Sequence, residues 1–349
     1  MSPAEDLEAQ ALEVGLRYVT DDLPGIGRLR RGRGFSYRLP SGETLTDGRV
    51  RRRIESHAIP PAWTDVWISP LASGHLQATG RDDLERKQYR YHPLWRKLRD
   101  DRKFHRMRSF GQRLPHLRAA VDRDLRRRTL TRERVVAAVV RLLETSCIRI
   151  GNEEYRRNHG TYGLTTMRKR HVELAGANSI RFQFVGKGGQ RQTVRVEDPR
   201  TARVVRRLQE LPGQELFHYE GEEGELERVD SDDVNEYIHR HAGSRYTAKD
   251  FRTWMGTLQA LLALAEVDVG ESAGERSRLI VQAVDRVAEN LRNTRAVCRA
   301  SYIHPDLLEL YEEGLLLDIA DLASSQPSAW LDAEEVALMR VLHHLDEAS

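Results

Sequence analysis

Residues 131–146, TRERVVAAVVRLLETS, carry a clear helical pattern. Apolar side chains recur at the three- and four-residue spacing of one buried helix face; they are Val135, Val136, Val139, Leu142 and Leu143. Thr131 is suited to cap this helix, and Glu133 places a carboxylate in its first turn, where the helix dipole favours negative charge. The segment predicts a buried helix at the start of a mostly α-helical region.

One β-like island interrupts this helical region. In SIRFQFV (179–185) apolar and polar residues alternate, which predicts a strand with one buried face, and RQTVRV (191–196) is its expected partner across a GKGG turn. TAKD (247–250) fits a capping box with Asp in place of the usual Glu. It precedes a predicted helix, and a further helix is predicted over about 275–291.

The N-terminal part of the chain has a different pattern, with short β-like runs between turn signals. The runs are VWIS (66–69), HLQATG (75–80) and RKQYRYH (86–92). From about 94 to 128 the pattern becomes charged and helical.

The length of 349 residues suggests about two domains. We therefore expect an α+β protein with a small β-rich N-terminal domain (1–98). A larger, mostly α-helical domain (99–349) would follow, beginning with a helical connector (99–128).

Composition excludes several classes of protein. No run approaches the roughly 20 apolar residues of a membrane span, and the first residues, MSPAEDLEAQ, do not resemble a signal peptide. Two cysteines, Cys147 and Cys298, exclude a disulfide framework and a cysteine-based zinc site. The paired histidines at 239 and 241 and at 343 and 344 have no further ligand at metal spacing. We expect a soluble, cytoplasmic protein without a metal.

The charge is distributed unevenly. Residues 21–140 contain 28 Lys and Arg against 14 Asp and Glu, a net charge of +14, whereas residues 305–349 contain 11 acidic residues and one arginine, a net charge of −10. A basic N-terminal half favours a polyanionic partner, typically nucleic acid. The alternative is a solvated, salt-bridged surface, because acidic residues are interleaved with the basic ones.

Only six of the 56 basic residues are lysines, at 87, 97, 103, 169, 187 and 249. Lysine can release its proton, whereas arginine in effect cannot, so each retained lysine is a candidate for proton transfer. GKGGQ (186–190) lacks the order of a P-loop, and the glycines of GIGRLRRGRG (25–34) do not form a dinucleotide fingerprint. No nucleotide cofactor is expected.

Four segments contain residues suited to chemistry on a phosphodiester. They are CIRIGNEEY (147–155) with Arg149, FVGKGGQ (184–190) with Lys187, YTAKDFRTWMG (246–256) with Arg252, and NTRAVCRASYIHP (293–305) with Asn293 and Tyr302. Each has an ordinary structural explanation when taken alone. An arginine after a helix often caps it, a lysine in a turn is often solvated, and a tyrosine near a proline often packs.

In this order, the segments resemble type IB DNA topoisomerases of the short bacterial and poxvirus-like kind, from about residue 25 to 315. RKQYRYHPLWR (86–96) is similar to the N-terminal signature of that family. RIGNEEY, GLTTMRKRHV (163–172), FVGKGGQ, KDFRTW and the N-x8-Y spacing are similar to its catalytic domain. The resemblance implies the domain pair described above, with a catalytic domain of the tyrosine recombinase and topoisomerase IB type.

The resemblance also implies roles for five residues. Tyr302 would be the nucleophile and form a 3′-phosphotyrosyl intermediate. Arg149 and Arg252 would bind the non-bridging phosphate oxygens, to which planar guanidinium groups are suited. Asn293, where many members have histidine, would donate a further hydrogen bond. Lys187 would protonate the departing 5′-oxygen as general acid.

Further residues are expected to contact DNA. Lys249 lies three residues before Arg252, so it would assist Lys187 or contact phosphate; the alternative is a surface lysine. Gln88, Tyr89 and Tyr91 match positions that the family uses on DNA, and glutamine is suited to adenine edges. The two tyrosines share a strand face, and the alternative is that they pack in the core. Expected phosphate contacts are Arg86, Lys87 and Arg90.

The implied activity is relaxation of positive and negative supercoils through transient single-strand cleavage, without ATP, metal or cofactor. The partner would be double-stranded DNA, and the enzyme a bacterial monomer associated with the nucleoid. A tyrosine recombinase or integrase is the main alternative, because it uses the same chemistry. Recombinases usually show His-x-x-Arg where this chain has Lys249-x-x-Arg252, and usually begin with a helical domain. A non-enzymatic DNA-binding protein would leave the ordered set of five residues unexplained.

Overall fold

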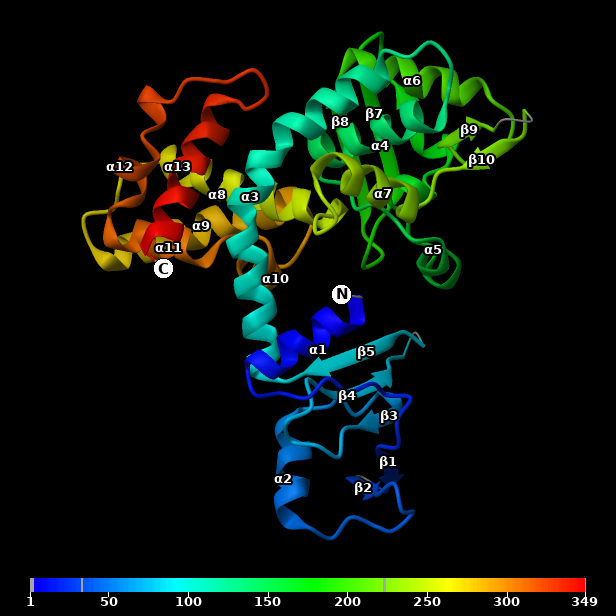
Figure 1. Ribbon diagram of the computed structural model, residues 1–349, viewed down its shortest axis with the longest axis vertical. Helices are drawn as coiled ribbons and strands as arrows, with labels where there is room; N and C mark the ends of the chain where they lie inside the picture. The colour runs from blue at the N-terminus through cyan, green and yellow to red at the C-terminus, as the bar shows by residue number, and fades with distance from the viewer. Residues whose placement is uncertain (1–2, 33, 84, 222–223, 349) are drawn as a thin grey trace. The chain divides into compact units, whose positions relative to one another are not determined.

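The computed structural model describes residues 3–32, 34–83, 85–221 and 224–348 (Figure 1). The chain divides into two compact units, Met1–Lys103 and Phe104–Ser349. The boundary between them falls inside one long helix, α3 (Pro93–Leu125). The helical pattern predicted over about 94–128 is therefore confirmed, and α3 contributes residues to both units.

The N-terminal unit is built around a five-stranded antiparallel sheet with the order β2-β1-β3-β4-β5. Its strands are β1 (Ile26–Arg31), β2 (Gly34–Arg38), β3 (Thr64–Ile68), β4 (Leu76–Arg81) and β5 (Lys87–Tyr91). The three predicted strands are confirmed as β3, β4 and β5. Ile26, Ile68 and Ala78 from the sheet pack with Ile54 to form the core of this unit.

The sequence analysis did not predict β1, β2 or the helices α1 (Pro3–Glu13) and α2 (Gly48–Ser56). In β1 only the first residue is buried, and the arginines that follow show no apolar alternation. In α2 Val50 and Ile54 lie one turn apart on the core side, and in β2 Phe35 and Tyr37 alternate with polar residues. Each pattern consists of only two apolar residues among glycines and arginines, which is too short for a sequence-based assignment.

The C-terminal unit is mainly helical, and the predicted helix α4 (Arg132–Ser146) is largely buried within it. The Thr131 hydroxyl accepts a hydrogen bond from the Arg134 N–H at 3.4 Å, so the predicted cap is confirmed. Around α4 lie helices and a strand from distant parts of the sequence (Figure 1). They are α6 (Pro199–Glu210), α7 (Ser231–Ala242), α8 (Ala248–Ala265) and β8 (Arg191–Glu197).

The predicted hairpin is confirmed as β7 (Ser179–Val185) and β8, with β6 (Val172–Leu174) completing a three-stranded sheet. Ile180, Phe182 and Phe184 are buried, so the alternation in the sequence does mark the core face. The capping box before α8 is also confirmed, because the Thr247 N–H donates to the Asp250 carboxylate at 2.8 Å.

The remaining elements complete this unit, and the acidic end of the chain packs into it. They are α5 (Glu153–His159), β9 (His218–Glu220), β10 (Leu226–Arg228), α9 (Ala273–Leu291), α10 (Arg295–Ser301), α11 (Pro305–Glu313), α12 (Leu316–Ala320) and α13 (Ala333–Ala348). Leu307, Leu338 and Leu342 lie in the core. None of the described helices combines the length and apolar character that a membrane span requires.

Candidate active site

The ends of two helices meet at Arg252, which the first turns of α8 place in the interior. Cys147 ends α4 in a left-handed conformation with φ of 54°. Arg252 is only 5% exposed, and its guanidinium donates to the Cys147 carbonyl and, at 2.7 Å, to the Leu291 carbonyl at the end of α9. The buried Nε has no hydrogen-bond partner among the described residues. Arg252 therefore joins the segments that lead to Arg149 and Asn293.

Arg149 and Asn293 meet beside this junction. The Arg149 guanidinium donates to the Asn293 side-chain oxygen, and the Asn293 amide donates to the Leu291 carbonyl at 3.4 Å. Burial lowers the pKa of Arg149, and the neighbouring charge of Arg252 lowers it further. An arginine nevertheless remains protonated in proteins, so two guanidinium charges lie close together here. Such a pair is suited to an anion with several oxygens.

Tyr302 ends α10 and lies against the same guanidinium. The guanidinium carbon of Arg252 is 5.0 Å from the centre of the Tyr302 ring. Burial alone would raise the pKa of Tyr302. The charge of Arg252, with the charges of Arg149 and Lys249, outweighs that effect and lowers the pKa from its ordinary value of 10.0. The site therefore makes the phenolate, the nucleophilic form of tyrosine, easier to form than in a free tyrosine.

Two contacts fix the backbone of Tyr302. Its N–H donates to the Cys298 carbonyl at 2.9 Å, and its carbonyl accepts from the Thr257 hydroxyl at 3.3 Å. Gly256 on α8 lies so close that an added Cβ would be 2.4 Å from the Tyr302 carbonyl oxygen. The sequence analysis did not select Gly256, although a glycine inside a predicted helix is a recognised signal of close packing.

Gly256→Ala is expected to displace Tyr302 and to lower the activity of the protein by tenfold or more, because a 1 Å shift of a reacting group has effects on the order of a hundredfold. Overpacking should also destabilise the fold by about 1–3 kcal/mol. Thermal melting and the rate of single-turnover DNA cleavage test both effects. Gly274→Ala in α9, where nothing lies within 4 Å of the new Cβ, is the matched control; it should leave the cleavage rate unchanged and should not lower the melting temperature, because alanine is favoured over glycine in a helix. Equal activity of the two variants would contradict this reading of the packing.

The structure does not bring Lys187 into contact with the other four residues. Lys187 is exposed in the turn between β7 and β8, and Gly188 and Gly189 adopt positive φ values of 83° and 75° there. It takes part in none of the hydrogen bonds or ion pairs found among the described residues. Lys249 is also exposed, unlike Arg252 on the same helix, and its charge reaches Tyr302.

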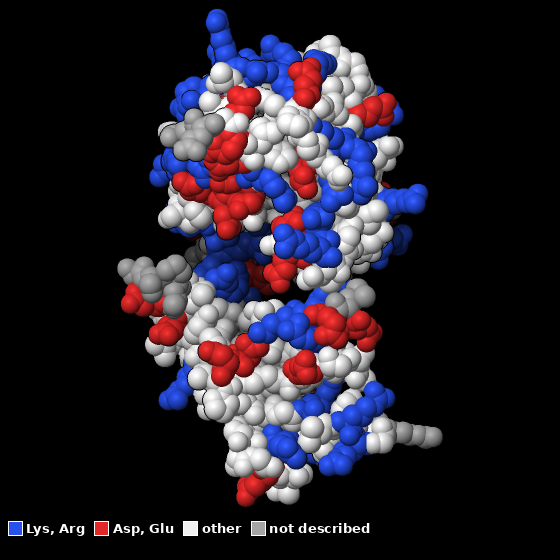
Figure 2. Space-filling view, turned by 90° about the vertical axis from the view of Figure 1, so that its right-hand side faces the viewer, with Lys and Arg blue, Asp and Glu red and all other residues white. Residues whose placement is uncertain are grey.

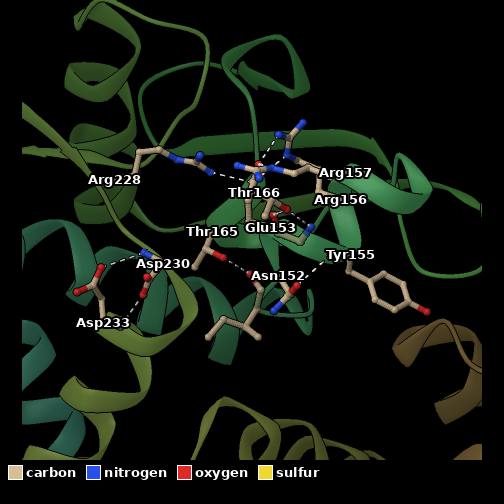
Figure 3. Close-up of polar contacts among 12 residues, drawn as sticks. Asn152, Glu153, Tyr155, Arg156, Arg157, Thr165, Thr166, Arg228, Asp230 and Asp233 are labelled. Carbon is tan, nitrogen blue, oxygen red and sulfur yellow. Dashed lines mark hydrogen bonds and ion pairs between the residues drawn. The ribbon is translucent and has the colours of Figure 1, made fainter. Parts of the chain in front are cut away.

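An ionic network holds the segment that follows Arg149 (Figure 3). Asn152 caps α5 by accepting from the Tyr155 N–H at 3.0 Å. Glu153 accepts from Arg156, and from Arg228 on β10 at 3.0 Å. Hydrogen bonding from Arg156 is the largest of the effects that lower the pKa of Glu153 to about 2. Tyr155 points away from this network in Figure 3.

Tyr89 and Tyr91 in the N-terminal unit are surface residues. Their rings stack 5.9 Å apart and are 46% and 36% exposed, which excludes packing in the sheet core. The predicted DNA contacts beside them have partners within the protein. The Gln88 amide donates to Asp82 at 2.9 Å, as does the Arg86 Nε at 2.6 Å; Lys87 pairs with Asp21 at 2.6 Å, and Arg90 donates to the Ala58 carbonyl at 3.2 Å.

The basic stretch of the sequence does not form a purely basic surface. Figure 2 shows Lys and Arg side chains spread over the visible face among acidic ones. Arg132 pairs with Asp233 and Glu236, and Arg108 pairs with Asp346 at 3.1 Å; these three acidic residues lie outside 21–140. The salt-bridged surface considered in the sequence analysis thus accounts for part of the +14 excess.

Comparisons with known proteins agree on one family. The model of the eukaryotic DNA topoisomerase I catalytic core matches residues 92–316, and that of the bacterial DNA topoisomerase IB N-terminal domain matches residues 34–82. DNA topoisomerase 1B of Acanthamoeba polyphaga mimivirus is 32% identical over 299 residues, 83% of this chain and 88% of that protein. DNA topoisomerase 1B of Vaccinia virus (strain Copenhagen) is 24% identical over 292 residues, 79% and 86% of the two chains. DNA topoisomerase 1 of Mycosarcoma maydis is 22% identical over 302 residues, 75% of this chain but 29% of that protein.

Proposed function

The chain belongs to the type IB DNA topoisomerases, a family of isomerases, and on this premise we propose that it relaxes both positive and negative supercoils. Relaxation would proceed by cleavage of one strand of duplex DNA through a 3′-phosphotyrosyl bond to Tyr302. Rotation of the DNA about the intact strand, followed by religation, would release the torsional stress.

The convergence of four residues from separate segments carries this proposal. Arg252 lies over the ring of Tyr302, and Arg149 is hydrogen-bonded to Asn293. A partly buried phenol beside two guanidinium groups is suited to attack on a phosphodiester, because the cations lower the pKa of the phenol and would stabilise charge on the non-bridging oxygens.

The proposed step conserves atoms and charge. The Tyr302 oxygen attacks phosphorus and loses its proton to solvent, the bond from phosphorus to the 5′-oxygen breaks, and Lys187 gives its proton to the leaving oxygen. Religation reverses each change when the 5′-hydroxyl attacks the phosphotyrosine. Arg149, Arg252 and Asn293 would hold the phosphate, and Lys249 would assist Lys187 or contact the phosphate.

Residues 1–98 would form the DNA-binding domain and residues 99–349 the catalytic domain. Tyr89 and Tyr91 form an exposed aromatic pair, which is suited to contact with nucleic acid. Gln88 would read base edges after exchanging its bond to Asp82. Arg86, Lys87 and Arg90 would contact phosphates in the same way.

The covalent intermediate stores the energy of the broken bond, so the reaction would need no ATP, metal or cofactor. The charge that a metal supplies in other phosphoryl transfers would come from the arginines and Lys187. We further propose that the protein acts as a monomer on double-stranded DNA in the bacterial cytoplasm, in association with the nucleoid.

Relaxation of supercoiled plasmid in EDTA without ATP tests the proposal. The protein is expected to relax positively and negatively supercoiled plasmid, with activity that falls at high salt as DNA binding weakens. Failure of the folded, DNA-binding protein to relax either substrate would overturn it, as would an absolute requirement for ATP or a metal. Strand exchange between two duplexes would instead favour the recombinase alternative.

A further inference from the structure

Arg292 adopts an unusual backbone conformation directly before Asn293. It ends α9 with φ of 52° and ψ of 57°, the left-handed region that disfavours residues with a Cβ and that glycine adopts freely. Of the six non-glycine residues with positive φ in the described part of the chain, Cys147 and Arg292 adjoin the candidate active site. Residues with a strained backbone concentrate at functional sites, and Arg292 directly precedes Asn293 of the candidate site.

The side chain of Arg292 connects the end of α9 with the hairpin that carries Lys187. Its guanidinium donates to the Asn290 carbonyl at 3.2 Å and, at 3.4 Å, to the carbonyl of Thr193 on β8. Burial lowers the pKa of Arg292, and its charge interacts with Cys147 and Arg252. The half-buried guanidinium is therefore placed between the site and β8.

The hairpin turn and the Asn293 loop also face a common hollow of about 480 Å³. Gln190, at the end of the turn, lines it together with Arg292 and Asn293. Lys187 is exposed in a glycine-rich turn, which by itself gives its ammonium group no fixed position. The hydrogen bond from Arg292 to the Thr193 carbonyl joins this hairpin to the loop that carries Asn293.

We propose that Arg292 is a positioning residue, which holds the hairpin against the Asn293 loop and thereby places Lys187 for proton transfer to the leaving 5′-oxygen. This inference rests on the proposed function, in which Lys187 is the general acid. Proton transfer requires a donor within hydrogen-bond reach of the leaving oxygen, so loss of the attachment reduces the rate of the chemical step.

The test compares cleavage of two DNA substrates by Arg292→Gly in single-turnover experiments. Glycine retains the backbone conformation and removes the guanidinium, so the variant should fold. Cleavage of the ordinary phosphodiester is expected to slow by about tenfold to a hundredfold, the scale of a misplaced catalytic group. A substrate with sulfur in place of the bridging 5′-oxygen releases a thiolate that needs no proton. On that substrate the variant should match the wild type.

Three further proteins complete the experiment. Lys187→Ala should also recover on the sulfur substrate, and Lys187→Ala combined with Arg292→Gly should cleave the ordinary substrate no more slowly than Lys187→Ala alone. Arg295→Ala is the matched control. Arg295 lines the same hollow, but it pairs with Asp285 and has no bond to β8 among the described contacts, so its removal should leave both rates unchanged.

The outcomes separate the inference from the proposed function. An equal slowing of Arg292→Gly on both substrates would mean that Arg292 acts on the phosphate, and unchanged rates would mean that it has no role. Either result overturns the inference and leaves the proposed function intact. If Lys187→Ala does not recover on the sulfur substrate, Lys187 is not the general acid; the inference and that one role are then overturned, whereas relaxation through Tyr302 is tested separately by the plasmid assay.

Discussion

Tyr302→Phe is expected to abolish plasmid relaxation and covalent attachment to DNA while the protein remains folded and binds duplex DNA. The substitution removes one oxygen and keeps the ring that lies 5.0 Å from the Arg252 guanidinium. Removal of a covalent nucleophile elsewhere has cost on the order of a millionfold in rate, which is below detection in a relaxation assay. The measurements are relaxation of supercoiled plasmid and capture of the covalent complex on a denaturing gel.

Tyr311→Phe is the matched control for this variant. Tyr311 is 1% exposed, and its hydroxyl interacts with the Gly270 backbone rather than with a residue of the candidate site. Loss of that hydroxyl should therefore leave relaxation unchanged. Residual activity in Tyr302→Phe near the wild-type level would assign the nucleophile to another residue.

Tyr302→Phe also allows the ionisation of Tyr302 to be measured. The ultraviolet titration of wild type minus that of Tyr302→Phe isolates this phenol, and its midpoint is expected below 10.0 because Arg252, Arg149 and Lys249 outweigh the effect of burial. The pKa is depressed on folding, so ionisation of Tyr302 stabilises the folded protein above the unfolded pKa of about 10. That contribution is lost as the pH falls through the lowered pKa. A midpoint at or above 10 would contradict the electrostatics of the site.

Local signals in the sequence were sufficient to predict several of the helices and strands that surround the site. The caps at Thr131 and Thr247 and the alternation at Phe182 and Phe184 depend only on neighbouring residues, and the structure confirms them. By contrast, α2 and β2 each place only two apolar side chains on the core, Val50 with Ile54 and Phe35 with Tyr37, and β1 buries only its first residue, so these patterns are too short to identify the elements.

The residues of the site were named from family resemblance, because no local pattern shows that segments more than a hundred residues apart converge. Arg149 and Asn293 are an example of such a pair. The sequence analysis missed Gly256 and Arg292, since their roles depend on tertiary contacts. Position 256 must be glycine because the Tyr302 backbone lies too close for a Cβ, and Arg292 contacts Thr193 on β8. The position of Lys187 beside DNA remains a prediction.

Arg252→Gln is expected to reduce DNA cleavage by about a thousandfold to a hundred-thousandfold, the range found when an arginine that stabilises phosphoryl transfer is removed. Glutamine removes the charge next to Tyr302, and because it is shorter it leaves the carbonyls of Cys147 and Leu291 without the donors that Arg252 supplies. Unsatisfied buried carbonyl groups should destabilise the fold by about 1–3 kcal/mol. Single-turnover cleavage at a temperature where the variant is fully folded separates the two effects.

Arg134→Gln provides the control for burial alone. Arg134 is 8% exposed and donates to the carbonyls of Arg128 and Thr129. Its buried Nε has no hydrogen-bond partner among the described residues. Arg134 is therefore in an environment similar to that of Arg252, at the opposite end of α4. Its substitution should destabilise the fold to a similar extent and leave the cleavage rate unchanged. If both variants lost activity in proportion to stability, Arg252 would have only a structural role.

The titration of Tyr302 makes the test of Arg252 independent of DNA. Arg252 makes the largest of the contributions that lower the pKa of Tyr302, so Arg252→Gln should raise the midpoint of the phenol, whereas Arg134→Gln should not move it. A rise together with the loss of cleavage would show that one guanidinium both activates the nucleophile and binds the phosphate. An unchanged midpoint together with lost cleavage would limit Arg252 to the phosphate, and the lowered pKa would then have to come from Arg149 and Lys249.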